Sequence, residues 1–98
     1  MRIEFANDDL ARIYTDEAHR MGLPFAVIKA ARRKLIQLEA ARDERDLRNL
    51  KGLNYKKLQG EREGQRQIRV NDQYRIVFTL SEEQRTPVIT IIEIGDTH

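Results

Sequence analysis

The segment Asn71-Asp72-Gln73 separates two runs in which apolar and polar residues alternate. Asparagine and aspartate are common turn residues, so the two runs predict the strands of a hairpin. A two-residue turn would mix apolar and polar side chains on both faces of the hairpin. A three-residue turn instead places Ile68 opposite Ile76 and leaves one face apolar. The same register places Arg69 opposite Arg75 on the other face, and we prefer it.

This register brings two like charges together. Arginines directly opposite each other repel, so the pair lowers the stability of the hairpin. Two guanidinium groups can also grip a phosphate through bidentate hydrogen bonds, which would give the pair a purpose. The alternative is a solvated face on which each arginine is paired with a carboxylate of Glu61, Glu63 or Asp72. The residues alone leave both interpretations open.

Basic residues are concentrated around the hairpin. Residues 49–75 contain seven of the 18 lysines and arginines and three of the 16 acidic residues, so this segment has a net charge of +4. The rest of the chain carries −2, since the whole chain carries +2. A basic hairpin on a mildly acidic body indicates a polyanion as the partner, and RNA is the commonest one.

The composition indicates one small soluble domain, residues 1–98, in which 40% of the residues are apolar and 35% are charged. The chain has no cysteine, which excludes disulfides and thiolate zinc sites and favours a reducing cytoplasm. No apolar run is long enough to cross a bilayer, and the N-terminus lacks the apolar segment of a signal peptide. We therefore expect a cytoplasmic protein without a membrane partner.

The remaining sequence predicts two helices and two further strands. Alternation from Arg2 to Phe5 indicates a first strand, and the apolar run from Val88 to Ile94 indicates a central final strand. One helix is expected from Asn7 or Asp8 to about Arg20 and another from Pro24 to about Arg42. The apolar stripe of the second helix comprises Phe25, Ile28, Ala31, Leu35 and Leu38. This order predicts an α+β domain with two N-terminal helices packed on a small, mainly antiparallel twisted sheet.

The basic run Arg32-Arg33-Lys34 falls on the second predicted helix. Consecutive residues of a helix point in different directions, so the three charges cannot all face one ligand. We interpret the run mainly as a solvated face, and contact with RNA or a partner is the alternative.

An acid and an imidazole, Asp96 and His98, follow the final strand. If that strand lies beside the hairpin, both groups approach the arginine pair. Cleavage of RNA by its own 2'-hydroxyl needs a base, cations that hold the charge on phosphorus, and an acid for the leaving 5'-oxygen. Histidine can act as either acid or base, although a terminal histidine can equally be frayed. His19 lies on the first predicted helix and is interpreted as structural.

Other site chemistries fit the sequence poorly. Two histidines without clustered carboxylates make a poor metal site, so neither a metal nor another cofactor is expected. The sequence contains no Walker phosphate loop and no Gly-x-Ser-x-Gly elbow, and Ser81 is its single serine. An RNA-directed acid–base mechanism is therefore the chemistry that these residues favour.

Three segments carry a resemblance to a known family: Leu58-Gln59-Gly60 with the following residues 61–65, the stretch from Ile68 to Phe78, and Asp96-Thr97-His98. In these segments and in the order of its elements, the chain resembles the HigB toxins of bacterial toxin-antitoxin pairs, a branch of the RelE superfamily. The resemblance implies an endoribonuclease, an mRNA interferase, that enters the ribosomal A site and cuts translated messenger RNA without a metal. It also implies a HigA-like antitoxin with a helix-turn-helix domain, through which alone the toxin would contact operator DNA.

The resemblance also assigns roles to residues of this chain. Arg69 and Arg75 would stabilise the scissile phosphate, and Asn71 would hold the loop between them. Asp96 and His98 would transfer protons or orient the RNA. The expected RNA-binding residues are Lys56, Lys57, Arg66 and Asn71.

Two residues depart from the family pattern. Gln59 stands where the family usually has a lysine, so one phosphate-binding cation is missing unless Lys56 or Lys57 replaces it. Thr97 stands in place of the usual aromatic residue, which puts more weight on His98. The alternative function is therefore a catalytically inactive module on the same fold that binds RNA or an antitoxin. A housekeeping protein that binds structured RNA is a third candidate.

Overall fold

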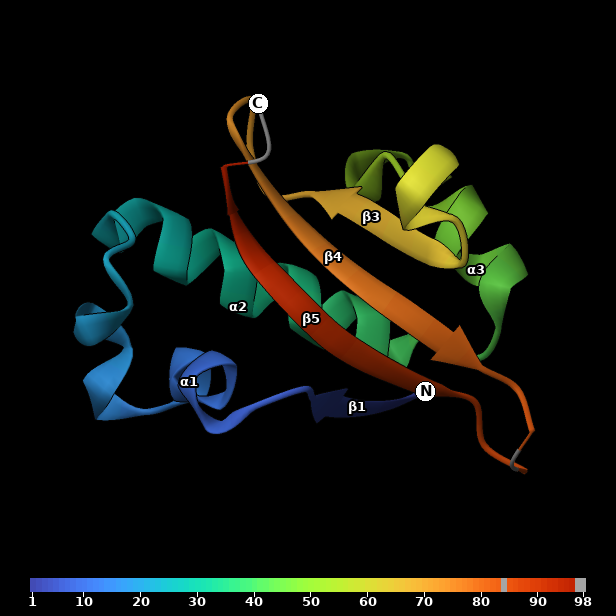
Figure 1. Ribbon diagram of the computed structural model, residues 1–98, viewed down its shortest axis with the longest axis horizontal. Helices are drawn as coiled ribbons and strands as arrows, with labels where there is room; N and C mark the ends of the chain where they lie inside the picture. Colours follow the sequence, from blue (N-terminus) through green and yellow to red (C-terminus); the bar gives the residue numbers. More distant parts are fainter. Residues whose placement is uncertain (84, 97–98) are drawn as a thin grey trace.

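The computed structural model describes residues 1–83 and 85–96, which form helices and a five-stranded sheet (Figure 1). The strands are β1 (Arg2–Phe5), β2 (Lys56–Lys57), β3 (Gln65–Arg69), β4 (Tyr74–Ser81) and β5 (Val88–Asp96). The α-helices are α1 (Asp8–Ala11), α2 (Phe25–Ala40) and α3 (Glu44–Asn49). The short 3-10 helices are η1 (Arg12–Tyr14), η2 (Asp16–Met21), η3 (Lys51–Leu53) and η4 (Gly60–Arg62).

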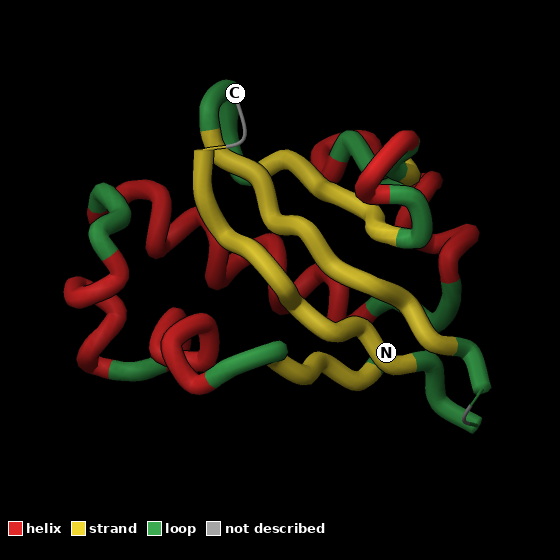
Figure 2. The backbone as a smooth tube through the Cα atoms, viewed as in Figure 1, coloured by secondary structure: helices red, strands yellow, loops and turns green. Residues whose placement is uncertain are grey.

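The sheet has the strand order β1-β5-β4-β3-β2. The outermost strand β1 runs parallel to β5, and all other neighbours are antiparallel. In Figure 1, α2 crosses behind β4 and β5, and the other face of the sheet is turned toward the viewer. Figure 2 shows the same layering, with helical segments behind the three long strands. The predicted α+β class and the mainly antiparallel sheet are therefore confirmed.

The hairpin of β3 and β4 has the predicted register. Ile68 pairs with Ile76, and Arg69 pairs with Arg75. Residues 71–73 form the turn, which Val70 closes by donating its backbone N–H to the carbonyl oxygen of Tyr74 at 2.9 Å. Ile68 and Ile76 are fully buried in the core with α2. The helix-facing side of the hairpin is therefore apolar, and the arginines leave the sheet on the opposite side.

The first predicted helix is wrong as one continuous element. The segment that was expected to run from Asn7 to about Arg20 forms three short pieces, α1, η1 and η2. Thr15 interrupts them in an extended conformation, and its hydroxyl oxygen accepts a hydrogen bond from the backbone N–H of Glu17 at 3.1 Å. A threonine that caps a new turn in this way competes with continuation of the preceding helix.

The second predicted helix corresponds to α2, but one residue of its predicted core stripe is exposed. Ile28, Ala31, Leu35 and Leu38 are buried as expected. Phe25 is instead 73% exposed, because it is the first residue of α2 and lies before the buried residues begin at Val27. The Lys29 ammonium lies over its ring, 5.6 Å from the ring centre. No helix in the described part of the chain is long and apolar enough to span a bilayer.

Candidate functional site

Arg69 and Arg75 form the centre of the candidate site. They are direct partners on β3 and β4, so their side chains leave the same face of the sheet. This face is the one opposite α2, since the neighbouring pair Ile68 and Ile76 lies in the core. The fold therefore brings two guanidinium groups to one open surface.

The two arginines differ in their surroundings. Arg69 forms an ion pair with Asp72, and the two side chains are 41% and 92% exposed. Such an exposed pair contributes little stability, so a phosphate can replace the carboxylate. Arg75 has no carboxylate within ion-pair distance among the described residues. Its Nη1 donates instead to the carbonyl oxygens of Asn71 and Tyr74, at 2.6 and 3.0 Å.

Asn71 organises the turn between the two arginines. Its side-chain oxygen accepts hydrogen bonds from the backbone N–H groups of Gln73 and Tyr74, at 2.9 and 2.8 Å. An asparagine that bonds to the backbone two and three residues later is a common way of fixing a tight turn. The Asn71 carbonyl oxygen also accepts a hydrogen bond from Arg75 Nη1, so the turn fixes the direction of this guanidinium group.

The final strand lies beside the hairpin, which is the arrangement that the expected approach of Asp96 and His98 requires. Asp96 pairs with Tyr74, and its Oδ2 accepts a hydrogen bond from Gln73 Nε2 at 2.9 Å. Gly95 pairs with Arg75 and places no side chain next to it. Within residues 1–83 and 85–96, no group of three or more histidine, cysteine or acidic side chains is placed to hold a metal ion. The other predicted residue at this end, His98, lies outside the described residues, as does Thr97.

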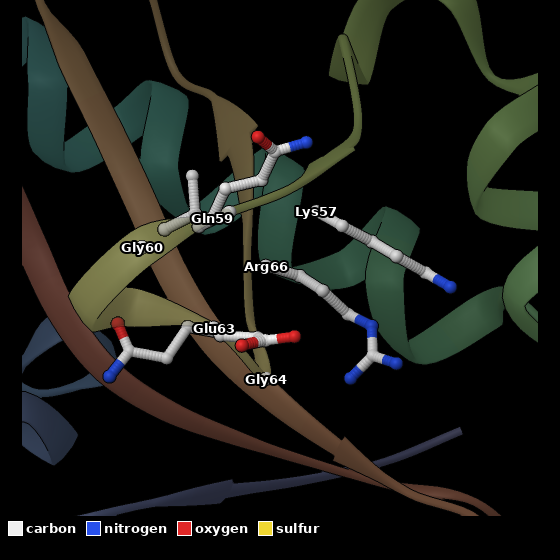
Figure 3. Close-up of a pocket in the computed structure, with 8 residues that line it drawn as sticks. Lys57, Gln59, Gly60, Glu63, Gly64 and Arg66 are labelled. Atoms are coloured by element: carbon white, nitrogen blue, oxygen red, sulfur yellow. The ribbon is translucent and has the colours of Figure 1, made fainter.

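The predicted RNA-binding residues Lys57 and Arg66 are not near the arginine pair. They are cross-strand partners on β2 and β3 and point toward α3, and Figure 3 shows them extending in the same direction. Both approach the carboxylate of Glu44, Arg66 Nε at 3.3 Å and Lys57 Nζ at 3.8 Å. Lys56 pairs with Gln67, so it lies on the same face as Arg69. Of the predicted lysines, only Lys56 shares the open face.

Glu44 is the centre of this second cluster. It also accepts hydrogen bonds from Arg48 Nη2 at 2.9 Å and from the Tyr55 hydroxyl at 2.8 Å. Burial alone raises the pKa of the Glu44 carboxyl, but the hydrogen bond from Tyr55 and the charges of Lys57, Arg48 and Arg66 outweigh it and lower the pKa. Burial and then the bond to Glu44 raise the pKa of Tyr55 to about 12. Tyr55 also stacks on Phe78, so it is held in the fold and cannot stack on a base.

Glu44→Gln is expected to lower the free energy of unfolding by about 1–3 kcal/mol at neutral pH, because it removes the charge that compensates the half-buried Arg66. The lowered pKa of Glu44 means that its contribution is present above the ordinary value of 4.5 and is lost as the pH falls below it. The free energies of unfolding of the unaltered protein and of Glu44→Gln, measured by denaturant titration from neutral pH to below pH 4.5, should therefore converge at acidic pH. Glu4→Gln, which breaks the exposed pair with Arg2, is the matched control and should change little.

Gln59, which stands where the family usually has a lysine, lies on the segment that follows β2. Gln59 lines a cavity of about 610 Å³ beside β2 and η4, together with Lys57, Glu63 and Arg66 (Figure 3). Lys57 is directed to Glu44 and does not substitute for that lysine at the arginine pair. Arg62 of η4 forms an ion pair with Glu93 of β5 at 2.5 Å, which ties this segment to the sheet.

Sequence reasoning missed two lysines that lie beside Arg69. A second cavity, of about 400 Å³, is lined by Lys34 of α2, Lys51 of η3 and Arg69 of β3, together with Asn54 and Asn71. Lys34 belongs to the basic run of residues 32–34, for which contact with RNA was the less favoured interpretation. Lys51 had been counted only in the charge of the basic segment. Their proximity depends on how α2 packs against the hairpin, which no local pattern reveals.

Two comparisons with known proteins each match most of the chain and agree with each other. The family model described as the RelE-like toxin of type II toxin-antitoxin system HigB matches residues 3–89. Toxin HigB-1 of Vibrio cholerae is 38% identical over 78 residues, which cover 80% of this chain and 82% of that protein.

Solved structures with a similar fold are toxins as well. YafQ from Escherichia coli BL21(DE3) has a TM-score of 0.60 at 15% identity, over 99% of this chain and 94% of that one. The YoeB/ParE toxin from Agrobacterium tumefaciens has a TM-score of 0.57 at 14% identity, over all of both chains. A chain of the YoeB-YefM complex from Staphylococcus aureus has a TM-score of 0.58 at 15% identity, over 100% and 98%. At these identities the likeness concerns the fold.

Proposed function

Because the chain belongs to the RelE-like HigB toxins of type II toxin-antitoxin systems, we propose that it is an endoribonuclease that cuts messenger RNA on the ribosome. The observation that carries the proposal is the arginine pair on the open face of the sheet. A like-charged pair costs stability in a hairpin, and it is useful where an anion must be held between two cations. The scissile phosphate of RNA is such an anion.

In the proposed reaction the RNA supplies its own nucleophile. The 2'-oxygen attacks the adjacent phosphorus and forms a cyclic phosphate, while the bond from phosphorus to the 5'-oxygen of the next nucleotide breaks. A base takes the proton of the 2'-hydroxyl, and an acid protonates the leaving 5'-oxygen. Arg69 and Arg75 donate hydrogen bonds to the non-bridging oxygens, where negative charge grows in the transition state. The arginines thus supply the positive charge that the reaction needs.

The proton-transfer groups are assigned by motif and by position. Asp96 lies at the end of β5 next to the turn, where it contacts Gln73 and can orient the RNA or a proton carrier. His98, two residues further along the chain, is proposed as the acid or base, since imidazole exchanges protons near neutral pH. Asn71 holds the turn, and Lys56 on the same face is proposed to contact the RNA backbone. Lys57 and Arg66 are proposed only as secondary contacts, because Glu44 holds them.

The proposed partner is an antitoxin with a helix-turn-helix domain, which would bind operator DNA on behalf of the complex. Support comes from the fold neighbours, which include the YoeB-YefM and DinJ-YafQ toxin-antitoxin complexes. A protein that acts on translated messenger RNA works in the cytoplasm, so we place it there.

The test of this function is to map the 5' ends of messenger fragments after brief induction in bacterial cells. Cuts that fall in phase with codons and only within translated regions would support ribosome-dependent cleavage, and each downstream fragment should begin with a 5'-hydroxyl group. Cuts that are equally frequent in untranslated regions would contradict the ribosome requirement. Growth arrest without any new 5' ends would contradict the nuclease itself.

A further inference from the structure

The cavity beside Arg69 has an unusual balance of charge. Lys34, Lys51 and Arg69 line it, and none of the described residues that line it is acidic, although Asp72 pairs with Arg69. The cations come from three elements that are far apart in the sequence, α2, η3 and β3. Cations that converge on one hollow raise the local positive potential and attract anions. The side-chain amides of Asn54 and Asn71 add hydrogen-bonding groups to the same wall.

Arg69 is paired with Asp72, but the two lysines of the cavity wall form no ion pair with a described residue. Lys34 Nζ donates one hydrogen bond to the carbonyl oxygen of Gly52 at 3.0 Å, which ties η3 to α2. An ammonium group has three donors, so two others can serve a ligand. Lys51 is exposed and has no ion pair or side-chain hydrogen bond within the described ranges. Both lysines that line the cavity therefore have donors to spare.

The cavity adjoins the arginine pair, since Arg69 and Asn71 belong to both. We propose that it binds a second phosphate of the RNA backbone, next to the phosphate held by Arg69 and Arg75. This inference rests on the proposed function and extends it: Lys34 and Lys51 take over the phosphate binding that Gln59 cannot provide. The phosphate belongs either to the messenger strand or to ribosomal RNA, and the test separates these sources.

The test compares Lys51→Ala with the unaltered protein in binding a short single-stranded RNA in which every 2'-hydroxyl is methylated to prevent cleavage. Fluorescence anisotropy is measured over a series of salt concentrations. We expect the affinity to fall about threefold to tenfold and the slope of log affinity against log salt to become shallower by about 0.7, the value for one lost phosphate contact on a single strand. Lys51→Arg should restore most of the affinity, because it keeps the charge.

The matched control is Lys29→Ala. Lys29 is an exposed lysine on α2, the same helix as Lys34, but it lies over Phe25 and does not line the cavity. It should leave both the affinity and the salt slope unchanged. Thermal melting of each variant shows whether the fold is intact, and because Lys51 is exposed no loss of stability is expected.

A second arm measures binding to purified ribosomes. A loss with the free oligonucleotide assigns the phosphate to the messenger strand, and a loss with ribosomes alone assigns it to ribosomal RNA. If Lys51→Ala binds both targets as tightly as the unaltered protein, the cavity is not a phosphate site, although in-phase cleavage by the unaltered protein would still support the nuclease. Failure of the proposed function is distinct, because the unaltered protein would then cut no messenger RNA, whether or not it binds these targets.

Discussion

Arg75→Ala is expected to slow messenger RNA cleavage by about 10²–10³-fold and to abolish growth arrest on induction. The reason is that Arg75 is held in place before RNA binds. Its Nη1 donates to the carbonyl oxygens of Asn71 and Tyr74, and no described carboxylate neutralises it. The measurement is the single-turnover rate of cleavage of a defined messenger on purified translating ribosomes.

Two further variants show whether the effect of Arg75→Ala arises from the site. Arg75→Lys keeps the charge but not the planar fork that binds a phosphate with two parallel hydrogen bonds, so it should recover only part of the rate. Arg20→Ala removes an exposed arginine of η2 and should leave the rate unchanged. Removing one of two facing arginines relieves repulsion, so Arg75→Ala should melt at the same or a higher temperature. If growth arrest survives in Arg75→Ala while RNA binding is lost, the chain is the inactive binding module and not a nuclease.

The sequence was sufficient to predict the centre of the site because strand alternation determines it. Once the turn has three residues, the pairing of Ile68 with Ile76 and the pairing of Arg69 with Arg75 follow from each other. Because one face of the hairpin is buried, only one register places its apolar residues in the core. The alternation of residues in the two strands is therefore enough to predict which residues pair. The approach of Asp96 was expected only on the condition that the final strand lies beside the hairpin, and the pairing of β5 with β4 meets this condition.

The part that the sequence could not predict depends on partners from distant segments. Lys57 and Arg66 belong to the basic segment by sequence, but strand alternation turns them to the helix side, where Glu44 holds them. No residue near Lys57 or Arg66 in the sequence indicates that the Glu44 carboxylate, which belongs to α3, will lie beside them. Conversely, Lys34 belongs to the basic run that was interpreted mainly as a solvated face, and the packing of α2 against the hairpin brings it to the cavity beside Arg69. Charge counted along the chain therefore does not show that Glu44 pairs with Lys57 and Arg66, and it does not show that Lys34 lies beside Arg69.

The first predicted helix, which is divided into α1, η1 and η2, shows a second reason why the sequence could not predict every element. Periodicity favoured one helix from Asn7 to about Arg20, and Asn7 does cap the first turn, through a bond from the backbone N–H of Leu10. Thr15 then begins a new turn with its own cap. The preference of such residues for capping is of the same size as the propensity differences that extend a helix, so the outcome depends on tertiary contacts. Arg32 supplies such contacts, since it donates to the carbonyl oxygens of Ile13 and Thr15.

Gly95→Val is expected to reduce cleavage by about 10²-fold while leaving the protein as stable as before or more stable. Gly95 is the cross-strand partner of Arg75, so a side chain there would leave the sheet on the same open face as Arg75. Displacing the scissile phosphate by about 1 Å is enough for a loss of this size. The fold can accept the change, because a Cβ atom at Gly95 would meet no other atom within 4 Å and the backbone does not have a positive φ.

Valine also favours a strand more than glycine does, which would raise the free energy of unfolding by about 0.5–1 kcal/mol. Denaturant unfolding and the ribosomal cleavage assay on the same preparation should therefore move in opposite directions. Gly95→Ala should give a smaller loss of cleavage, since a methyl group intrudes less. The matched control is Thr90→Val on the same strand, whose partner is Thr79 and not an arginine, and it should cleave normally. Full activity in Gly95→Val would mean that the RNA does not pass over Gly95 when its phosphate binds Arg75.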